Sequence, residues 1–160
     1  QVSLSDFKNK LIVLEWLNHG CPFIRKHYDG GNMQKLQKTY GEKGVIWLSI
    51  ISSAVGKQGH VDVKDALKDK KRYQSHSTFI LLDPQGKVGK LYKAKVTPHM
   101  FIISKKGEIV YQGAIDDQPD AEISSLILCR NFIVSFHDII ENAPTYTKVI
   151  CNLLYVKHSR

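Results

Sequence analysis

Residues 11–22 read LIVLEWLNHGCP. The first seven of them form a nearly continuous apolar run, which is typical of a central strand buried on both faces. Cys21 follows after a short turn, and Pro22 suits the first turn of a helix, where its missing N–H costs nothing. We therefore predict a buried strand over 11–17 that leads, at Cys21, into a helix.

The rest of the chain alternates between strand and helix signals around this unit. A helix beginning at Pro22 is predicted to run to Tyr40, and Gly41 and Gly44 are expected to end it. The further predicted elements are a strand at 45–51, a helix at 61–73, a strand at 78–82, a hairpin of strands at 99–103 and 108–112, and a long helix at 121–141. This order predicts an α/β fold in which a central mixed sheet is flanked by helices on both faces.

Length and composition indicate a single domain. The 160 residues are enough to bury a sizeable core, and Pro144 ends the last predicted helix, so we expect a domain over 1–143 and a C-terminal tail over 144–160. No apolar run approaches the ~20 residues of a transmembrane helix, and the given chain shows no signal peptide. We expect no membrane partner, while the compartment, bacterial periplasm or cytoplasm, stays open.

The net charge of +8 does not by itself indicate a polyanion partner. Nucleic-acid and anionic-membrane binding call for a cluster of basic residues, but here the lysines are spread along the chain. The densest stretch, 64–72, reads KDALKDKKR and includes two aspartates, as on the solvated face of a helix. We therefore expect no nucleic-acid partner.

Cys21 is the residue with the clearest chemical potential. At the start of a helix a thiolate meets unpaired backbone N–H groups and the positive end of the helix dipole, and both stabilise its charge. Arg25 and His19 lie close enough in sequence to add to this stabilisation. The alternative is that Cys21 is only a small core residue, since free cysteine is often buried.

Several segments resemble the redoxin, or alkyl hydroperoxide reductase/thiol-specific antioxidant, branch of the thioredoxin-like superfamily, and single-cysteine members within it. The resemblance rests on 13–16 (VLEW) followed by 21–24 (CPFI), and on Thr97-Pro98 before the predicted strand at 99–103. Shorter similar segments are 52–54 (SSA), 57–59 (KQG) and 113–117 (GAIDD). It covers roughly 3–143 and implies a thioredoxin-like fold in which Pro98 is a cis-proline packed beside Cys21.

The chain departs from the motifs of this superfamily at three positions. Thioredoxin-type reductases carry a CxxC pair, but Ile24 stands at the second position, so no disulfide can form within that motif. Peroxiredoxins place Pro and Thr or Ser seven and three residues before their reactive cysteine. Leu14 and Asn18 stand there in this chain, so the hydroxyl that activates peroxide is missing.

An oxidised Cys21 needs a second thiol to be reduced again. Cys129 falls on the apolar face of the last predicted helix, where a structural role is expected. Cys151 lies in the predicted tail, where a related subgroup carries a C-terminal cysteine. Either Cys151 resolves Cys21 or it is an incidental thiol and an external thiol protein acts as the reductant.

Around Cys21 we expect a substrate groove lined by His19, Pro22, Thr97 and His99, with Pro98 shaping it. His99 could approach the thiol and tune it, or could simply be a histidine at a strand edge. No metal site is expected, because His27 lies nearly two helical turns beyond Cys21. No organic cofactor is required.

These observations predict a thiol-based oxidoreductase. Cys21 would be the nucleophile toward a peroxide or a disulfide, Arg25 or His19 would stabilise its thiolate, and an antioxidant role would follow. The alternative is a redox-inactive module that holds a peptide or protein partner in the same groove. The missing CxxC and the missing peroxidase hydroxyl favour that alternative, and thiol reactivity distinguishes the two.

Overall fold

The computed structural model describes residues 1–116, 120–122 and 152–153. Its main sheet has five strands in the order β4-β3-β2-β5-β6. β2 pairs in parallel with β3, and β3 with β4, whereas β5 runs antiparallel to both β2 and β6. The bounds are β2 (Ile12–Trp16), β3 (Ile46–Ile51), β4 (Phe79–Leu82), β5 (His99–Ile103) and β6 (Ile109–Gly113). The predicted mixed sheet and the predicted hairpin are both confirmed.

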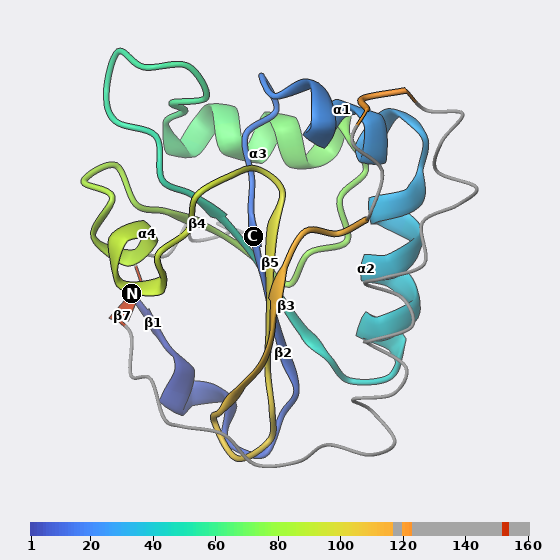
Figure 1. The fold of residues 1–160 in the computed structure, drawn as a ribbon, viewed down its shortest axis with the longest axis vertical. Helices are drawn as coiled ribbons and strands as arrows, with labels where there is room; N and C mark the ends of the chain where they lie inside the picture. The colour runs from blue at the N-terminus through green and yellow to red at the C-terminus, as the bar shows by residue number, and fades with distance from the viewer. Residues whose placement is uncertain (117–119, 123–151, 154–160) are drawn as a thin grey trace.

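Helices cover both faces of this sheet (Figure 1). The two parallel crossovers run in the same direction across the sheet, so their helices lie on one face. These are α1 (Pro22–Asp29), α2 (Asn32–Glu42) and α3 (Val63–Arg72), whereas α4 (Lys87–Tyr92) connects β4 to β5 across the other face. A two-stranded ribbon of β1 (Val2–Ser3) and β7 (Asn152–Leu153) and a short 3₁₀ turn, η1 (Leu4–Phe7), complete the described elements.

The core is divided by the sheet into two layers, as the alternation of β2 requires. Val13 and Leu17 point toward α1, α2 and α3, where Ile24, Met33 and other apolar side chains meet them. Ile12, Leu14 and Trp16 point toward α4 and its buried Val88 and Tyr92. β2 is therefore buried on both faces, as its apolar run predicts, and it is the central strand of the sheet.

The predicted helix over 22–40 is wrong as a single element. Two helices occupy the segment, because α1 ends at Asp29 and Gly31 adopts a left-handed conformation with φ of 71°. The Gly30 N–H closes α1 by donating to the Lys26 carbonyl over 3.1 Å. Glycine takes this backbone conformation without the steric cost that a Cβ brings, so the chain can turn between the helices.

The helix α4 was also not predicted from the sequence. Residues 83–86 form a turn in which the Gly86 N–H donates to the Asp83 carbonyl over 2.9 Å, and six helical residues follow it. The Asp83 carboxylate satisfies the free N–H groups of Val88 and Gly89 at 3.1 and 3.0 Å. This local capping lets a short lysine-rich segment form a helix.

Other predictions fall outside the described residues. They concern the helix at 121–141, the domain boundary at 143 and the tail at 144–160 beyond its residues 152–153. Among the residues that the structure describes, no helix is long and apolar enough to cross a membrane.

Candidate functional site

Cys21 lies at the carboxyl end of β2, immediately before the first turn of α1. It is the N-cap residue of α1 with extended backbone geometry, and Pro22 occupies the first helical turn. The Cys21 N–H donates to the Asn18 carbonyl over 2.9 Å, and the Gly20 N–H donates to the Asn18 side chain over 2.8 Å. A tight turn built on Asn18 therefore presents a partly buried thiol at the helix N-terminus.

Thr97 and Pro98 reach this thiol from the other half of the chain. β5 pairs with β2 so that His99 lies opposite Trp16, which places the residues before β5 beside the end of β2. The Cys21 thiol donates to the Thr97 carbonyl over 3.1 Å, and the Thr97–Pro98 peptide bond is cis. The structure thus brings together Cys21, Pro22, Thr97 and the buried Pro98.

The loop after β3 supports the Cys21 turn from outside. The Gln58 side-chain amide donates to the Gly20 carbonyl over 3.1 Å. Gly59 has a φ of 81°, and a Cβ at this position would overlap the Asn18 side chain. This close approach explains why the 57–59 segment needs glycine, which both avoids the overlap and takes the left-handed conformation.

Beneath the site lies a buried acid for which the sequence predicted no role. Glu15 is fully buried and accepts hydrogen bonds from four side chains. Burial raises the pKa of Glu15, although each of the four donors lowers it. The donors are Tyr28 at 2.9 Å, Gln37 at 3.1 Å, Trp47 at 2.8 Å and Ser49 at 3.0 Å. The signal for this network was the one charged residue inside the apolar run of β2.

A buried ion pair ties α1 to the segment after β6. Lys26, with no exposed side-chain area, lies 2.9 Å from the Asp116 carboxylate and also donates to the Asp120 carbonyl over 3.0 Å. His27 Nε2 lies 3.2 Å from the same carboxylate. Asp116 therefore neutralises the buried charge of Lys26. Its neighbour Asp117 lies outside the described residues.

The tautomer of His27 follows from its two neighbours. Its Nδ1 lies 2.9 Å from the Asn32 amide nitrogen, which can only donate, so Nδ1 accepts and Nε2 carries the proton. Burial lowers the pKa of His27 to about 4, although the Asp116 charge acts in the opposite direction. His27 is therefore neutral at neutral pH and donates to Asp116.

His19 packs into an aromatic cluster. Its ring stacks on Tyr73 with centroids 3.9 Å apart and meets Tyr28 edge-on at 5.0 Å. Burial, together with the nearby Arg72 charge, lowers the pKa of His19 to about 4. At neutral pH His19 carries no charge with which to stabilise a thiolate, and its place in the groove stays a prediction.

For Arg25 and His99 the structure shows side-chain contacts other than one with the Cys21 thiol. Arg25 is exposed, and its backbone N–H donates to the Cys21 carbonyl as part of α1, while its side chain lines a small cavity with Tyr73. His99 lies against Phe101, on the α4 side of the sheet, and its Nδ1 accepts from the Lys95 N–H over 3.3 Å. Burial lowers the pKa of His99.

Two further predicted residues cannot be placed, because Cys129 and Cys151 lie outside the described residues. Cys21 is the one cysteine within them, and its thiol is free. In the same part of the chain no three His, Cys, Asp or Glu side chains gather into a group that could hold a metal ion.

With this geometry in place, comparisons with known proteins identify relatives. Residues 1–127 match the family model described as Redoxin. A hypothetical protein of Sinorhizobium meliloti aligns with a TM-score of 0.71 and 20% identity over 98% of this chain and 84% of its own. An uncharacterized conserved protein of Geobacillus kaustophilus aligns with a TM-score of 0.70 and 22% identity over 99% and 82%.

A third relative is the thioredoxin domain of a thiol-disulfide oxidoreductase from Bacteroides vulgatus. It aligns with a TM-score of 0.55 and 21% identity over 79% of this chain and 83% of its own. No curated protein matches the chain. Together these likenesses show that the fold is thioredoxin-like, as the sequence predicts.

Proposed function

Because the chain belongs to the redoxin family, whose chemistry is thiol-based redox, we propose that it exchanges thiols and disulfides through Cys21. The observation that carries the proposal is the position of this thiol. It lies partly exposed at the N-terminus of α1 and within 3.1 Å of the Thr97 carbonyl. The helix N-terminus stabilises the thiolate that attacks, and the paired β2 and β5 hold the site rigid.

The reaction is a nucleophilic exchange. The Cys21 proton leaves to solvent, and the thiolate attacks one sulfur of a substrate disulfide. A new S–S bond to Cys21 forms, the substrate S–S bond breaks, and the departing thiolate takes up a proton. A second thiol then attacks the mixed disulfide and releases Cys21. We propose that this thiol comes from an external reductant protein or from Cys151.

Disulfides suit the site better than peroxides. The Asn18 side chain accepts from the Gly20 N–H and packs against Gly59, so it serves the turn that presents Cys21. It offers no hydroxyl in the position from which peroxidases activate their substrate. With a peroxide, Cys21 would become a sulfenic acid as the O–O bond breaks, and this oxidation is the second reaction to test.

The test uses the fully reduced protein and a neutral disulfide, 2-hydroxyethyl disulfide. We expect a mixed disulfide at Cys21, identified by peptide mass, and its release when dithiothreitol is added. Cys21→Ser is the control and should acquire no adduct at this peptide. A parallel sample with substoichiometric hydrogen peroxide should react more slowly; faster reaction with peroxide would make the protein a peroxidase instead.

The alternative, a redox-inactive module that binds a peptide in the groove beside Pro98, makes the opposite prediction. A Cys21 that forms no adduct with either oxidant would favour it. The resting hydrogen bond from the thiol to Thr97 is the feature compatible with such a role, because it holds the sulfur as a donor.

A further inference from the structure

A cavity of about 590 Å³ opens beside Cys21 on the α4 side of the sheet. Its wall is formed by the carboxyl ends of β2 and β3, by α4 and by the segment that leads into β5. Its lining includes Trp16, Ser52, Lys90, Lys93, Lys95 and Thr97. Cavities of this size hold ligands of a few hundred daltons.

The cavity reaches the reactive sulfur through Thr97. Thr97 lines the cavity, and its carbonyl accepts the hydrogen bond from the Cys21 thiol at 3.1 Å. Asn18, whose carbonyl accepts from the Cys21 N–H, lines it as well. Cys21 itself does not line the cavity, so a molecule bound there would reach the thiol past Thr97.

The floor of the cavity is an ordered polar chain. Trp16 Nε1 donates to the Ser52 hydroxyl over 3.1 Å, and Ser52 donates to the Asp83 carboxylate over 2.7 Å. The same carboxylate oxygen accepts from Val88 and Gly89, and Asp83 is only 5% exposed. Asp83 is thus engaged by three donors and does not line the cavity, whose charged lining residues are all lysines.

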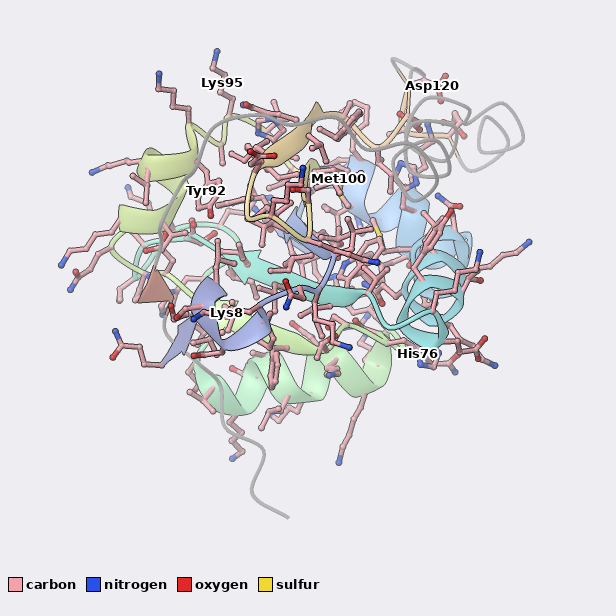
Figure 2. The ribbon with its side chains drawn as sticks, turned by 90° about the horizontal axis from the view of Figure 1, so that it is seen from below. Lys8, His76, Tyr92, Lys95, Met100 and Asp120 are labelled. Carbon is pink, nitrogen blue, oxygen red and sulfur yellow. The ribbon has the colours of Figure 1, made fainter. Side chains whose placement is uncertain are left out.

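The charge at the cavity mouth is positive, and no acidic residue within 84–107 balances it. Residues 84–107 include six lysines and no Asp or Glu. Lys90, Lys93 and Lys95 are exposed, and none of them forms an ion pair with a carboxylate in the part of the chain that the structure describes. Figure 2 shows the side chain of Lys95 extending away from the sheet. A cleft lined by one sign of charge concentrates ligands of the opposite sign.

Lys93 supplies a second, independent observation. It ends α4 in the left-handed conformation, with φ of 54° and ψ of 39°. Glycine is the usual residue there, because any Cβ costs about 1 kcal/mol or more in this conformation. From this position Lys93 lines the cavity together with Lys90 and Lys95.

We propose that this cavity binds the carboxylate-bearing part of the substrate, so that Cys21 acts preferentially on disulfides whose flanking groups are acidic. The proposal rests on the thiol–disulfide exchange proposed above. Lys90, Lys93 and Lys95 hold the carboxylates, the indole of Trp16 contacts the aliphatic part, and the disulfide lies beside Thr97 within reach of Cys21. The lysines orient the substrate and take no part in bond making or breaking.

The test compares three model disulfides with the reduced protein at low ionic strength: dithiodiglycolate with two carboxylates, neutral 2-hydroxyethyl disulfide, and cationic cystamine. The pocket variant replaces Lys90, Lys93 and Lys95 with Gln. The matched control replaces Lys38, Lys64 and Lys71 with Gln as well. These lysines are exposed on the opposite face, and the control loses the same net charge. We expect the rate ratio of dithiodiglycolate to 2-hydroxyethyl disulfide to fall about 10-fold in the pocket variant and less than 2-fold in the control.

A ratio that is unchanged in the pocket variant, or that falls equally in both variants, would overturn the proposal. A second measurement separates it from the chemistry of Cys21. Thiodiglycolate has two carboxylates but no S–S bond, and its binding to Cys21→Ser is followed by amide chemical shifts at Lys95 and Thr97. If the neutral disulfide fails to react while thiodiglycolate binds and the pocket variant loses that binding, the proposed function is wrong and the anion site stands. If thiodiglycolate does not bind, the site is wrong.

Discussion

The Cys21 thiol and the Thr97 carbonyl oxygen, 76 positions apart in the sequence, lie 3.1 Å from each other. The pairing of β2 with β5 creates this contact, because the register places Trp16 opposite His99 and so aligns the ends of the two strands. In the resting state the Cys21 thiol donates a hydrogen bond to the Thr97 carbonyl. Attack on a disulfide requires that proton to leave, so the contact is made in the resting state and broken in the reaction.

Replacing Gly59 with Ala should both destabilise the protein and slow Cys21. The new Cβ meets the Asn18 side chain, and the φ of 81° is unfavourable for alanine. Strain and overlap together should lower the free energy of unfolding by about 2–4 kcal/mol, measured by urea denaturation. The adduct rate at Cys21 should fall because the turn that presents it shifts.

Gly44→Ala is the matched control. Gly44 has a similar φ of 80°, but a Cβ there meets no atom within 4 Å. It should lose only the backbone contribution of about 1–2 kcal/mol and keep the wild-type adduct rate. Equal effects of the two substitutions on Cys21 would refute the role of the Asn18–Gly59 contact.

Glu15→Gln should change how stability depends on pH. The pKa of Glu15 is raised in the folded protein by burial, so above its ordinary value of 4.5 the folded state retains a proton that the unfolded state releases. The contribution of Glu15 to stability is complete below about pH 4.5 and is lost as the pH rises through the folded pKa. The stability advantage of the wild type over Glu15→Gln should therefore shrink as the pH rises above 4.5. A difference that stays constant as the pH rises would contradict the raised pKa.

His27→Gln should remove part of the loss of stability in acid. The folded pKa of about 4 lies below the ordinary 6.5, so between these values the unfolded chain binds a proton that the folded state does not. Stability is lost as the pH falls through this window, by about 3 kcal/mol for a shift of this size. The wild type should lose about that much more than His27→Gln between pH 7 and 4. The exposed His76, labelled in Figure 2, provides the control, since His76→Gln should follow the wild type.

Asp116→Asn should be strongly destabilising. It leaves the Lys26 ammonium, which has no exposed side-chain area, without its closest carboxylate at 2.9 Å. Breaking a buried pair from one side costs about 3–5 kcal/mol. In the double variant with Lys26→Met no buried charge is left unpaired, so it should unfold at a higher urea concentration than Asp116→Asn alone. A double variant that is less stable than Asp116→Asn would show that the pair is not the source of the effect.

The sequence predicted what depends on local pattern. The apolar run at 11–17 identified the central strand, and the Gly20-Cys21-Pro22 junction placed the thiol at a helix start. The sequence alone could not predict contacts between residues that lie far apart in the chain. Lys26 resembles any solvated helix lysine until Asp116 is seen beside it, and His19 stacks on Tyr73, which lies more than fifty residues away.

Two local features were also missed for physical reasons. Apolar residues at helical spacing in 22–40, such as Met33, Leu36 and Tyr40, favour a single helix. Only the left-handed Gly31 shows that the chain changes direction there. α4 is short and lysine-rich, and Asp83, which reads as a turn residue, caps it through its side chain. Lys90, Lys93 and Lys95 share one cavity with Trp16 because α4 packs against β2, and this packing cannot be predicted from the local pattern.

The most direct test of the account is the reactivity of Cys21 in the folded protein. Reduced protein is alkylated with iodoacetamide at pH 7, and peptide mapping gives the rate at Cys21 in the native state and in urea. Cys129 and Cys151 provide internal references in the unfolded sample. The account predicts that Cys21 reacts faster in the folded protein than in the unfolded chain, because the start of α1 stabilises its thiolate. A folded-state rate equal to or below the unfolded one would contradict a nucleophilic Cys21 and leave the site as a binding groove.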